Sequence, residues 1–177
     1  ATDVDPGDVL TWSVSSPAAN GAATVSGSGA SPSTFTYAPA VDFNGSDSFV
    51  VEVSDGNQTD VITVNVTVTA VNDAPVITQG AGPLSKSVAE EGTATWTASE
   101  LNATDVDAGA VLTWSVFSPA TNGAVTVSGT GASPSIFTYA PDADFNGTDV
   151  FVVEVSDGNA TDVVTMNVTV TNVNDAP

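Results

Sequence analysis

Apolar and polar residues alternate along most of this chain. Leu10, Trp12 and Val14 occupy every second position, with Thr11 and Ser13 between them. Rows of the same period run through residues 35–37, 49–53, 62–68 and 94–98. This period is typical of strands with one buried face. Asn-Gly, Asp-Gly and Gly-x-Gly sequences between the rows predict tight turns.

About seven short strands in ~100 residues, with turn signals between them, predict an all-β Greek-key β-sandwich of the immunoglobulin type. The three tryptophans, Trp12, Trp96 and Trp114, lie on the apolar side of their rows. We therefore expect them in the core and prefer this to an exposed aromatic platform for sugars.

The chain repeats itself with a period of 102 residues. Residues 1–75 align without a gap on residues 103–177, with 60 identities in 75 positions. A period of this length indicates an array of whole domains in tandem. We expect one repeat at 76–177 and another at 1–75. The latter has no counterpart of 76–102, which should supply the first two strands. Either the sequence begins inside a domain, or a neighbouring chain supplies these strands.

Charge narrows the possible partners. Lys86 is the only cation against 21 acidic residues, and the formal net charge is -20. Binding to nucleic acid or to an anionic membrane surface needs clustered Lys and Arg, so both partners are excluded. No apolar run is long enough to span a membrane, so no insertion is expected. Because so many carboxylates repel one another, a cation is the first partner to consider.

The acidic residues are mostly aspartate, 16 Asp against 5 Glu, and they gather in loops that recur in both repeats. The clusters are Asp3 and Asp5 with copies Asp105 and Asp107; Asp55 with its copy Asp157; Asn72 and Asp73 with copies Asn174 and Asp175; and Asp42, Asn44 and Asp47 with copies Asp144, Asn146 and Asp149.

Calcium is the ion that these clusters suit best. It takes six to eight oxygen ligands at flexible geometry, whereas magnesium prefers few carboxylates and several waters. Zinc is disfavoured because the chain has neither His nor Cys. Two plainer explanations remain: Asp, Asn and Gly simply form turns, or the acids hydrate the surface of a halophilic protein. Recurrence of several clusters and the preference for Asp favour calcium.

The motifs ATDVD, VSDG and VNDAP, together with SVAEEGT at residues 87–93, resemble those of cadherin-type repeats. The resemblance covers the whole chain and is specifically to the bacterial cadherin-like repeats of giant surface adhesins. It implies calcium ions between consecutive domains, with an extracellular or cell-surface location.

The resemblance also implies a set of ligands. Asn72 and Asp73 would come from the linker, and Asp105, Asp107 and Asp157 from the second repeat. Asp42, Asn44 and Asp47 are weaker candidates from the first. Glu90 or Glu91 would be the glutamate that the family places at the far end of a domain, and residues 1–75 hold no counterpart of either.

Several functions follow as hypotheses. The leading one is a calcium-stiffened spacer in an adhesin or surface protein, with adjacent repeats as partners. The alternative is a subunit of a self-assembling extracellular filament or sheath, with other copies of the chain as partners. Sugar binding lacks an exposed aromatic cluster. Catalysis is the weakest, because a carboxylate pair could serve a glycosidase but every acidic motif is duplicated. We expect no enzyme activity.

Overall fold

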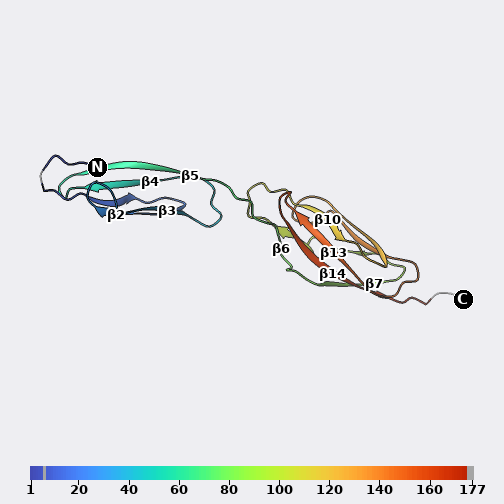
Figure 1. Cartoon of the computed structure of the whole chain (residues 1–177). Coiled ribbons are helices and arrows are strands. Elements are labelled where there is room, and N and C mark those ends of the chain that lie inside the picture. Colours follow the sequence, from blue (N-terminus) through green and yellow to red (C-terminus); the bar gives the residue numbers. More distant parts are fainter. Residues whose placement is uncertain (6, 175–177) are drawn as a thin grey trace. The chain divides into compact units, whose positions relative to one another are not determined.

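The computed structural model describes residues 1–5 and 7–174. The chain forms two compact units, unit 1 at Ala1–Val71 and unit 2 at Asn72–Pro177, so the linker residues Asn72 and Asp73 belong to unit 2 (Figure 1). The repeat alone placed the boundary after Pro75. In the part of the chain that the structure describes, no helix is long and apolar enough to cross a membrane.

Unit 2 contains the strands that the alternating pattern predicts. It also contains strands of two residues, which are too short for the pattern to indicate. In chain order, the strands are β6 (Val76–Ile77), β7 (Leu84–Ala89), β8 (Ala94–Thr95), β9 (Ala103–Thr104), β10 (Thr113–Ser118), β11 (Gly123–Ser128), β12 (Ile136–Pro141), β13 (Gly147–Ser156) and β14 (Thr161–Thr171).

These strands form two main sheets, in the orders β10-β13-β14-β7 and β11-β12-β8, with β6 and β9 paired separately. The chain passes from one sheet to the other after β7, after β8, after β10 and after β12, which is the connectivity of a Greek-key sandwich. β7 runs parallel to β14, while β13 and β14 are antiparallel (Figure 1). The all-β sandwich expected from the sequence is confirmed.

The core of unit 2 lies between the two sheets. Trp114 is 2% exposed and packs there with Tyr139, Phe151 and Met166. Its indole N–H donates a 3.0 Å hydrogen bond to the carbonyl of Gly131, which satisfies its one polar atom. Trp114 is therefore the core tryptophan that the pattern predicts, whereas Trp96 is partly buried and packs against the same core.

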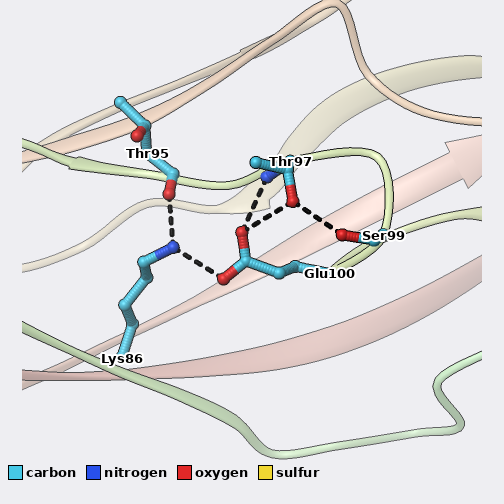
Figure 2. A network of polar contacts seen from close by, with 5 residues as sticks. All are labelled: Lys86, Thr95, Thr97, Ser99 and Glu100. Carbon is cyan, nitrogen blue, oxygen red and sulfur yellow. Dashed lines mark hydrogen bonds and ion pairs between the residues drawn. The ribbon is translucent and has the colours of Figure 1, made fainter.

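The segment between β7 and β9 is held by the only cation in the chain. Lys86 Nζ lies 2.7 Å from Glu100 Oε1 and also donates to the carbonyl of Thr95 (Figure 2). The other oxygen of Glu100 accepts hydrogen bonds from the backbone N–H and the hydroxyl of Thr97, both at 2.9 Å. Lys86 also lies 5.2 Å from the ring centre of Trp96. These contacts fasten β7 to the chain that follows β8.

Unit 1 contains the counterparts of β10 to β14. They are β1 (Thr11–Ser16), β2 (Gly21–Ser28), β3 (Thr34–Pro39), β4 (Gly45–Ser54) and β5 (Thr59–Val68), in the sheet order β3-β2-β1-β4-β5. Strands β4 and β5 pair along ten residues, from Gly45 opposite Val68 to Ser54 opposite Thr59, as β13 and β14 do in unit 2. β5 is thus the last strand of its sheet (Figure 1).

The core of unit 1 is much smaller than that of unit 2. Among its described residues, the buried cluster consists of Val25, Phe49 and Val51. Trp12 is partly buried beside them, and its indole N–H donates to the carbonyl of Gly29. The prediction that Phe35 and Ile62 face a core is wrong for unit 1, because both are exposed. Both lie on the outer strands of the sheet, β3 and β5, whereas Val51, the β4 residue opposite Ile62, is 2% exposed.

Candidate functional site

The acidic residues at one end of unit 2 come from three separate segments. Asp105 and Asp107 directly follow β9, Asp157 follows β13, and the linker residues Asn72 and Asp73 precede β6. Asn72 Nδ2 lies 2.9 Å from Asp157 Oδ2, and the backbone N–H of Asp73 donates a 2.9 Å hydrogen bond to Asp107 Oδ2. The structure therefore joins Asn72 to Asp157 and Asp73 to Asp107, and we call these five residues the acidic end of unit 2. Among the described residues, their carboxylates do not form a group of three within 4.8 Å of one another.

Asp157 is held by the tight turn that it begins. Its Oδ1 accepts the backbone N–H groups of Asn159 at 2.6 Å and Ala160 at 2.7 Å, as expected of an Asx turn. These two bonds, with the Asn72 amide, lower the pKa of the Asp157 carboxyl below its usual value. The group thus stays a carboxylate, and its Oδ2 faces the linker.

Asp105 carries a feature found at no other described residue. Its Oδ1 accepts the backbone N–H of Asp107 at 2.8 Å, but its Oδ2 is buried and has no hydrogen-bond partner among the described residues. Leaving a buried polar atom without a partner costs about 1–3 kcal/mol, and more for a charged group. A cation beside Oδ2 would remove this cost, so the donor set at the acidic end fits calcium.

Asp105 also lines a cavity at this end of unit 2. A cavity of about 290 Å³ is bordered by Asp105, Asp107 and Gly109. The side chains of Thr104 and Ala110 also line it. A calcium ion with six to eight oxygen ligands would need part of its shell from water, for which the cavity has room.

Unit 1 has an equivalent acidic end, which contains one more carboxylate, that of Asp8. Carboxylate oxygens of Asp3, Asp8 and Asp55 all lie within 4.8 Å of one another. Asp55 begins the same turn as Asp157, and the N–H groups of Gln58 and Asn57 lower the pKa of its carboxyl. Asp5 gives its backbone N–H to Asp3 and lies outside the group.

The predicted residues Asp42, Asn44, Asp144 and Asn146 lie in the turns before β4 and β13. Asp42 and Asp144 have φ values of 59° and 60° and are exposed, so they serve the turn, which Asp tolerates better than most residues. Asn44 is exposed, whereas Asn146 Nδ2 lies 3.5 Å from a carboxylate oxygen of Glu90.

Asp149 is buried and accepts four hydrogen bonds from the protein. The donors are the backbone N–H groups of Thr121, Asn122 and Val150 and the hydroxyl of Tyr139, at 2.8–3.1 Å. Burial opposes ionisation, but these donors outweigh it and hold the pKa of the Asp149 carboxyl below its usual value.

Asp47 makes the same set of contacts in unit 1 through Ala19, Asn20, Ser48 and Tyr37. The oxygens of Asp47 and Asp149 are thus engaged by donors of the protein itself, and both stay predictions as ligands.

Glu90 forms a second polar cluster, at the end of β14. It is buried, and its Oε1 accepts the side-chain amide of Asn172 at 3.1 Å and the backbone N–H of Val173 at 2.6 Å. Glu91 is exposed, and Asn174 lies just beyond the cluster in sequence. Asp175, the last predicted ligand, lies outside the described residues.

Sequence reasoning missed four residues at these sites. Asn159 donates a 3.0 Å hydrogen bond to Asn72 Oδ1, and Asp162 accepts the backbone N–H of Ile77 at 2.8 Å. Both recur in the repeat, as Asn57 and Asp60, which is a signal that could have found them. Asp8 and Asn172 are replaced by Ala110 and Ala70 in the other repeat, so duplication gave no signal.

Comparisons with known proteins agree with this architecture. Residues 72–173 match the family model of the bacterial cadherin-like domain, and residues 1–69 match that of a bacterial Ig domain. No curated protein sequence matches the chain.

Among solved structures, the extracellular cadherin domains 1-5 of protocadherin gamma B2 share 16% identity at a TM-score of 0.54, over 94% of this chain and 34% of that one. An endo-fucoidan hydrolase from glycoside hydrolase family 107 shares 21% identity at a TM-score of 0.42, over 95% of this chain and 24% of that one.

The S-layer protein SbsC, residues 31-844, shares 22% identity at a TM-score of 0.37, over 96% of this chain and 21% of that one. This chain thus spans about a quarter of the hydrolase and a third of the protocadherin. Likeness at these identities concerns the fold alone. The family model, by contrast, matches more than half of the sequence, and the chain belongs to the bacterial cadherin-like domain family.

Proposed function

We propose that this chain is a calcium-stiffened spacer of an extracellular bacterial adhesin or surface protein. The single observation that carries the proposal is Asp105, whose Oδ2 is buried without a hydrogen-bond partner among the described residues. A positive charge beside such an oxygen would offset the cost of its burial. The chain has one cation, Lys86, and its partner is Glu100.

Asp105, Asp107 and Asp157 would hold the ion in unit 2, with Asp73 as a fourth carboxylate. In unit 1, Asp3, Asp8 and Asp55 are the equivalent set. The ion would supply positive charge only. Asn72 and Asn159 already hold the linker against Asp157 at 2.9–3.0 Å, so the ion would strengthen an attachment formed by hydrogen bonds.

The mechanical effect follows from electrostatics. Without the ion, neighbouring carboxylates at the acidic end repel one another, and two like charges a few ångströms apart cost about 1–4 kcal/mol at the surface of a protein. With the ion, the same groups are drawn together and the linker residues are fixed to unit 2. A linker fixed in this way has fewer conformations, and this is what a spacer needs.

The proposal includes location and partners. Extracellular calcium modules bind the ion at about 10⁻⁴–10⁻³ M, which suits an extracellular or cell-surface location. Adjacent repeats of the same chain would be the immediate partners. We assign no catalysis, because Asp3 and Asp55 recur as Asp105 and Asp157, and repeated carboxylates suit one role served in both units.

A calcium titration followed by NMR tests the proposal residue by residue. We expect the backbone amides of Asp107 and Asn159 to shift saturably at submillimolar to millimolar calcium. In the Asp105→Asn variant these shifts should be lost, while the equivalent shifts near Asp55 remain. Equal shifts with magnesium or sodium at the same ionic strength would contradict a calcium site.

Self-assembly into a filament or sheath is the second candidate, and one observation favours it. Strand β5 is the last strand of its sheet, and Val61 and Ile62 on it are exposed. Exposed strand edges of this kind pair readily with other chains. A mass that keeps growing with concentration would support this candidate, whereas a spacer forms no open-ended assembly.

A further inference from the structure

The four-stranded sheet of unit 2 carries exposed apolar side chains on its outer face. Each of its strands, β10, β13, β14 and β7, has one row of side chains towards the core and an alternate row that faces away. On the outward rows, Phe117 is 62% exposed, Val150 47% and Val163 37%. Single exposed apolar residues are normal, whereas neighbouring ones mark surfaces that bind something.

A β-bulge brings Phe117 next to the valines. The pairing of β10 with β13 shifts by one residue at Phe117, so this residue opposes Val152 on the outer face. Val152 is partly exposed and lies two positions after Val150 on the same outward row. Val163 opposes Glu154, the next outward residue of β13, and is therefore the diagonal neighbour of Val152. We call Phe117, Val150, Val152 and Val163 the outer patch.

Unit 1 does not reproduce the outer patch, although its sequence is so similar. The two repeats differ at 15 of 75 positions, because 60 are identical, and three of the 15 fall on the outward rows of β10, β13 and β14. In all three, a serine of unit 1 is replaced in unit 2 by a residue with more carbon. The exchanged pairs are Ser15 and Phe117, Ser46 and Thr148, and Ser48 and Val150.

The outer face is also nearly free of charge. Among the residues described in its four strands, the outward rows hold one charged residue, Glu154. The chain as a whole has a formal net charge of -20. A basic partner would therefore be drawn to the acidic ends and away from this face. A second copy, placed with the same face against it, brings neutral groups against neutral groups and leaves most carboxylates in water.

The area of the face decides what a contact of this kind can achieve. Strand β13 has 10 residues, so the face is about 33 Å long and, with four strands, about 19 Å wide. One chain would then bury about 600 Å² and two chains about 1,200 Å², which is the lower end of specific interfaces. The face is large enough for a dimer, and the dimer is a weak one.

We propose that the outer patch of unit 2 is the contact surface of a weak homodimer. The sheet of one chain packs face to face on the same sheet of a second copy, with the four apolar side chains of each between them. Burial of these side chains favours the dimer, and the net charge of the two chains opposes it. Salt screens this repulsion, so the dimer becomes stronger as the ionic strength rises.

This dimer goes beyond the role of a spacer and does not rest on calcium binding. It also differs from a filament formed through the edge of β5. A two-fold contact uses the same surface on both chains and therefore stops at two, whereas pairing along a strand edge continues from chain to chain.

Sedimentation equilibrium of the full chain tests the proposal. In about 1 M sodium chloride, where the Debye length is about 3 Å, we expect the mass to rise from 17.6 kDa towards twice this value and no further. The protein concentration is raised from about 10 μM to about 1 mM, the range that a weak dimer needs. In about 0.1 M salt the dissociation constant should be roughly tenfold higher or more. Calcium and chelator at matched ionic strength should give the same result.

The other repeat supplies the variants. Phe117→Ser combined with Val150→Ser gives unit 2 the residues that unit 1 has in the same strands, so serine is compatible with both positions. This variant should dimerise roughly tenfold more weakly or worse, because it removes two of the four apolar contacts of each chain. Ile136→Thr is the matched control. Ile136 is 49% exposed on β12, in the other sheet, and unit 1 has threonine at its counterpart Thr34, so this variant should dimerise as the parent does.

Three results would overturn the proposal. The first is a parent chain that keeps a mass of 17.6 kDa at the highest concentration in high salt, which would leave the outer patch to a partner of another sequence. The second is a dimer that the double serine variant retains. The third is an association that Ile62→Ser abolishes, because Ile62 is exposed on β5 and the contact would then belong to that strand.

Discussion

The side chain of Asn72 donates a 2.9 Å hydrogen bond to Oδ2 of Asp157, which lies 85 residues further along the chain. Asn159 closes the contact by donating to Asn72 Oδ1 at 3.0 Å. The start of the linker is therefore part of unit 2, joined to the turn between β13 and β14. These hydrogen bonds position Asp157, one of the carboxylates that would bind calcium.

Replacing Asp105 should separate the effect of charge from that of calcium. In chelator, Asp105→Asn should leave the stability of unit 2 equal or higher, because it removes a buried charge without a partner. In 10 mM calcium it should lose a stabilisation of about 1.4 kcal/mol, the value for one site with a Kd of about 1 mM. Urea unfolding, monitored through the amide signals of β13, measures the stability of unit 2 in chelator and in calcium. Asp142→Asn, at an exposed residue, should change neither by more than ~0.5 kcal/mol.

At one position the two repeats differ in a possible calcium ligand, so each repeat can be given the residue of the other. Asp8 belongs to the carboxylate group of unit 1, and its counterpart in unit 2 is Ala110. Asp8→Ala should weaken calcium binding at unit 1 by roughly tenfold, since affinity rises with the number of charged ligands. Ala110→Asp should strengthen binding at unit 2. NMR titration follows calcium binding at each unit separately. The proposed role of Asp8 is contradicted if Asp8→Ala changes binding at unit 2 or if Ala110→Asp changes binding at unit 1.

Tyr139→Phe tests the structural role assigned to Asp149. The hydroxyl donates at 3.0 Å to this buried carboxylate, so removing it should cost unit 2 about 1–2 kcal/mol at pH 7. The folded-state pKa of Asp149 is lowered, so its contribution is present above the unfolded-state pKa and is lost as the pH falls through the folded-state pKa. The cost of Tyr139→Phe should therefore shrink in acid. A cost that does not change as the pH is lowered until the unit unfolds would contradict this assignment.

The Lys86–Glu100 pair gives a second pH dependence. Hydrogen bonds from Lys86 and Thr97 lower the pKa of Glu100 from 4.5 to about 2. The stabilisation should be complete above about pH 5 and lost as the pH falls towards 2. Because Glu100 is substantially exposed, Glu100→Gln should cost only about 0.2–1 kcal/mol, and less in high salt. Glu91→Gln, at an exposed glutamate, is the control and should change the free energy of unfolding at pH 7 by no more than ~0.5 kcal/mol.

The fold could be predicted from the sequence to a large extent, because strand alternation depends only on local pattern. Trp114 and the inward rows of β13 and β14 lie where the period of two places them. The same pattern was wrong for Phe35 and Ile62, because burial depends on a covering segment far from them in sequence. Alternation reports which face of a strand is apolar and does not report whether anything lies on it.

The acidic clusters could be found in the sequence, but their roles could not be separated. Asp149 and Asp157 look alike as repeated loop aspartates, yet four protein donors satisfy Asp149. Gly123 contributes to this, because a side chain there would meet the Tyr139 ring at 2.6 Å. The contact of Glu90 with Asn172 joins residues 82 positions apart, a separation that no local motif indicates.

Thermal unfolding of the full chain across a calcium titration tests the central claim most directly, with magnesium and sodium chloride at matched ionic strength as controls. We expect a saturable rise in Tm at submillimolar to millimolar calcium that the controls do not reproduce. An equal rise with salt, or none with calcium, would contradict the claim, and the carboxylates would then act only by hydrating the surface.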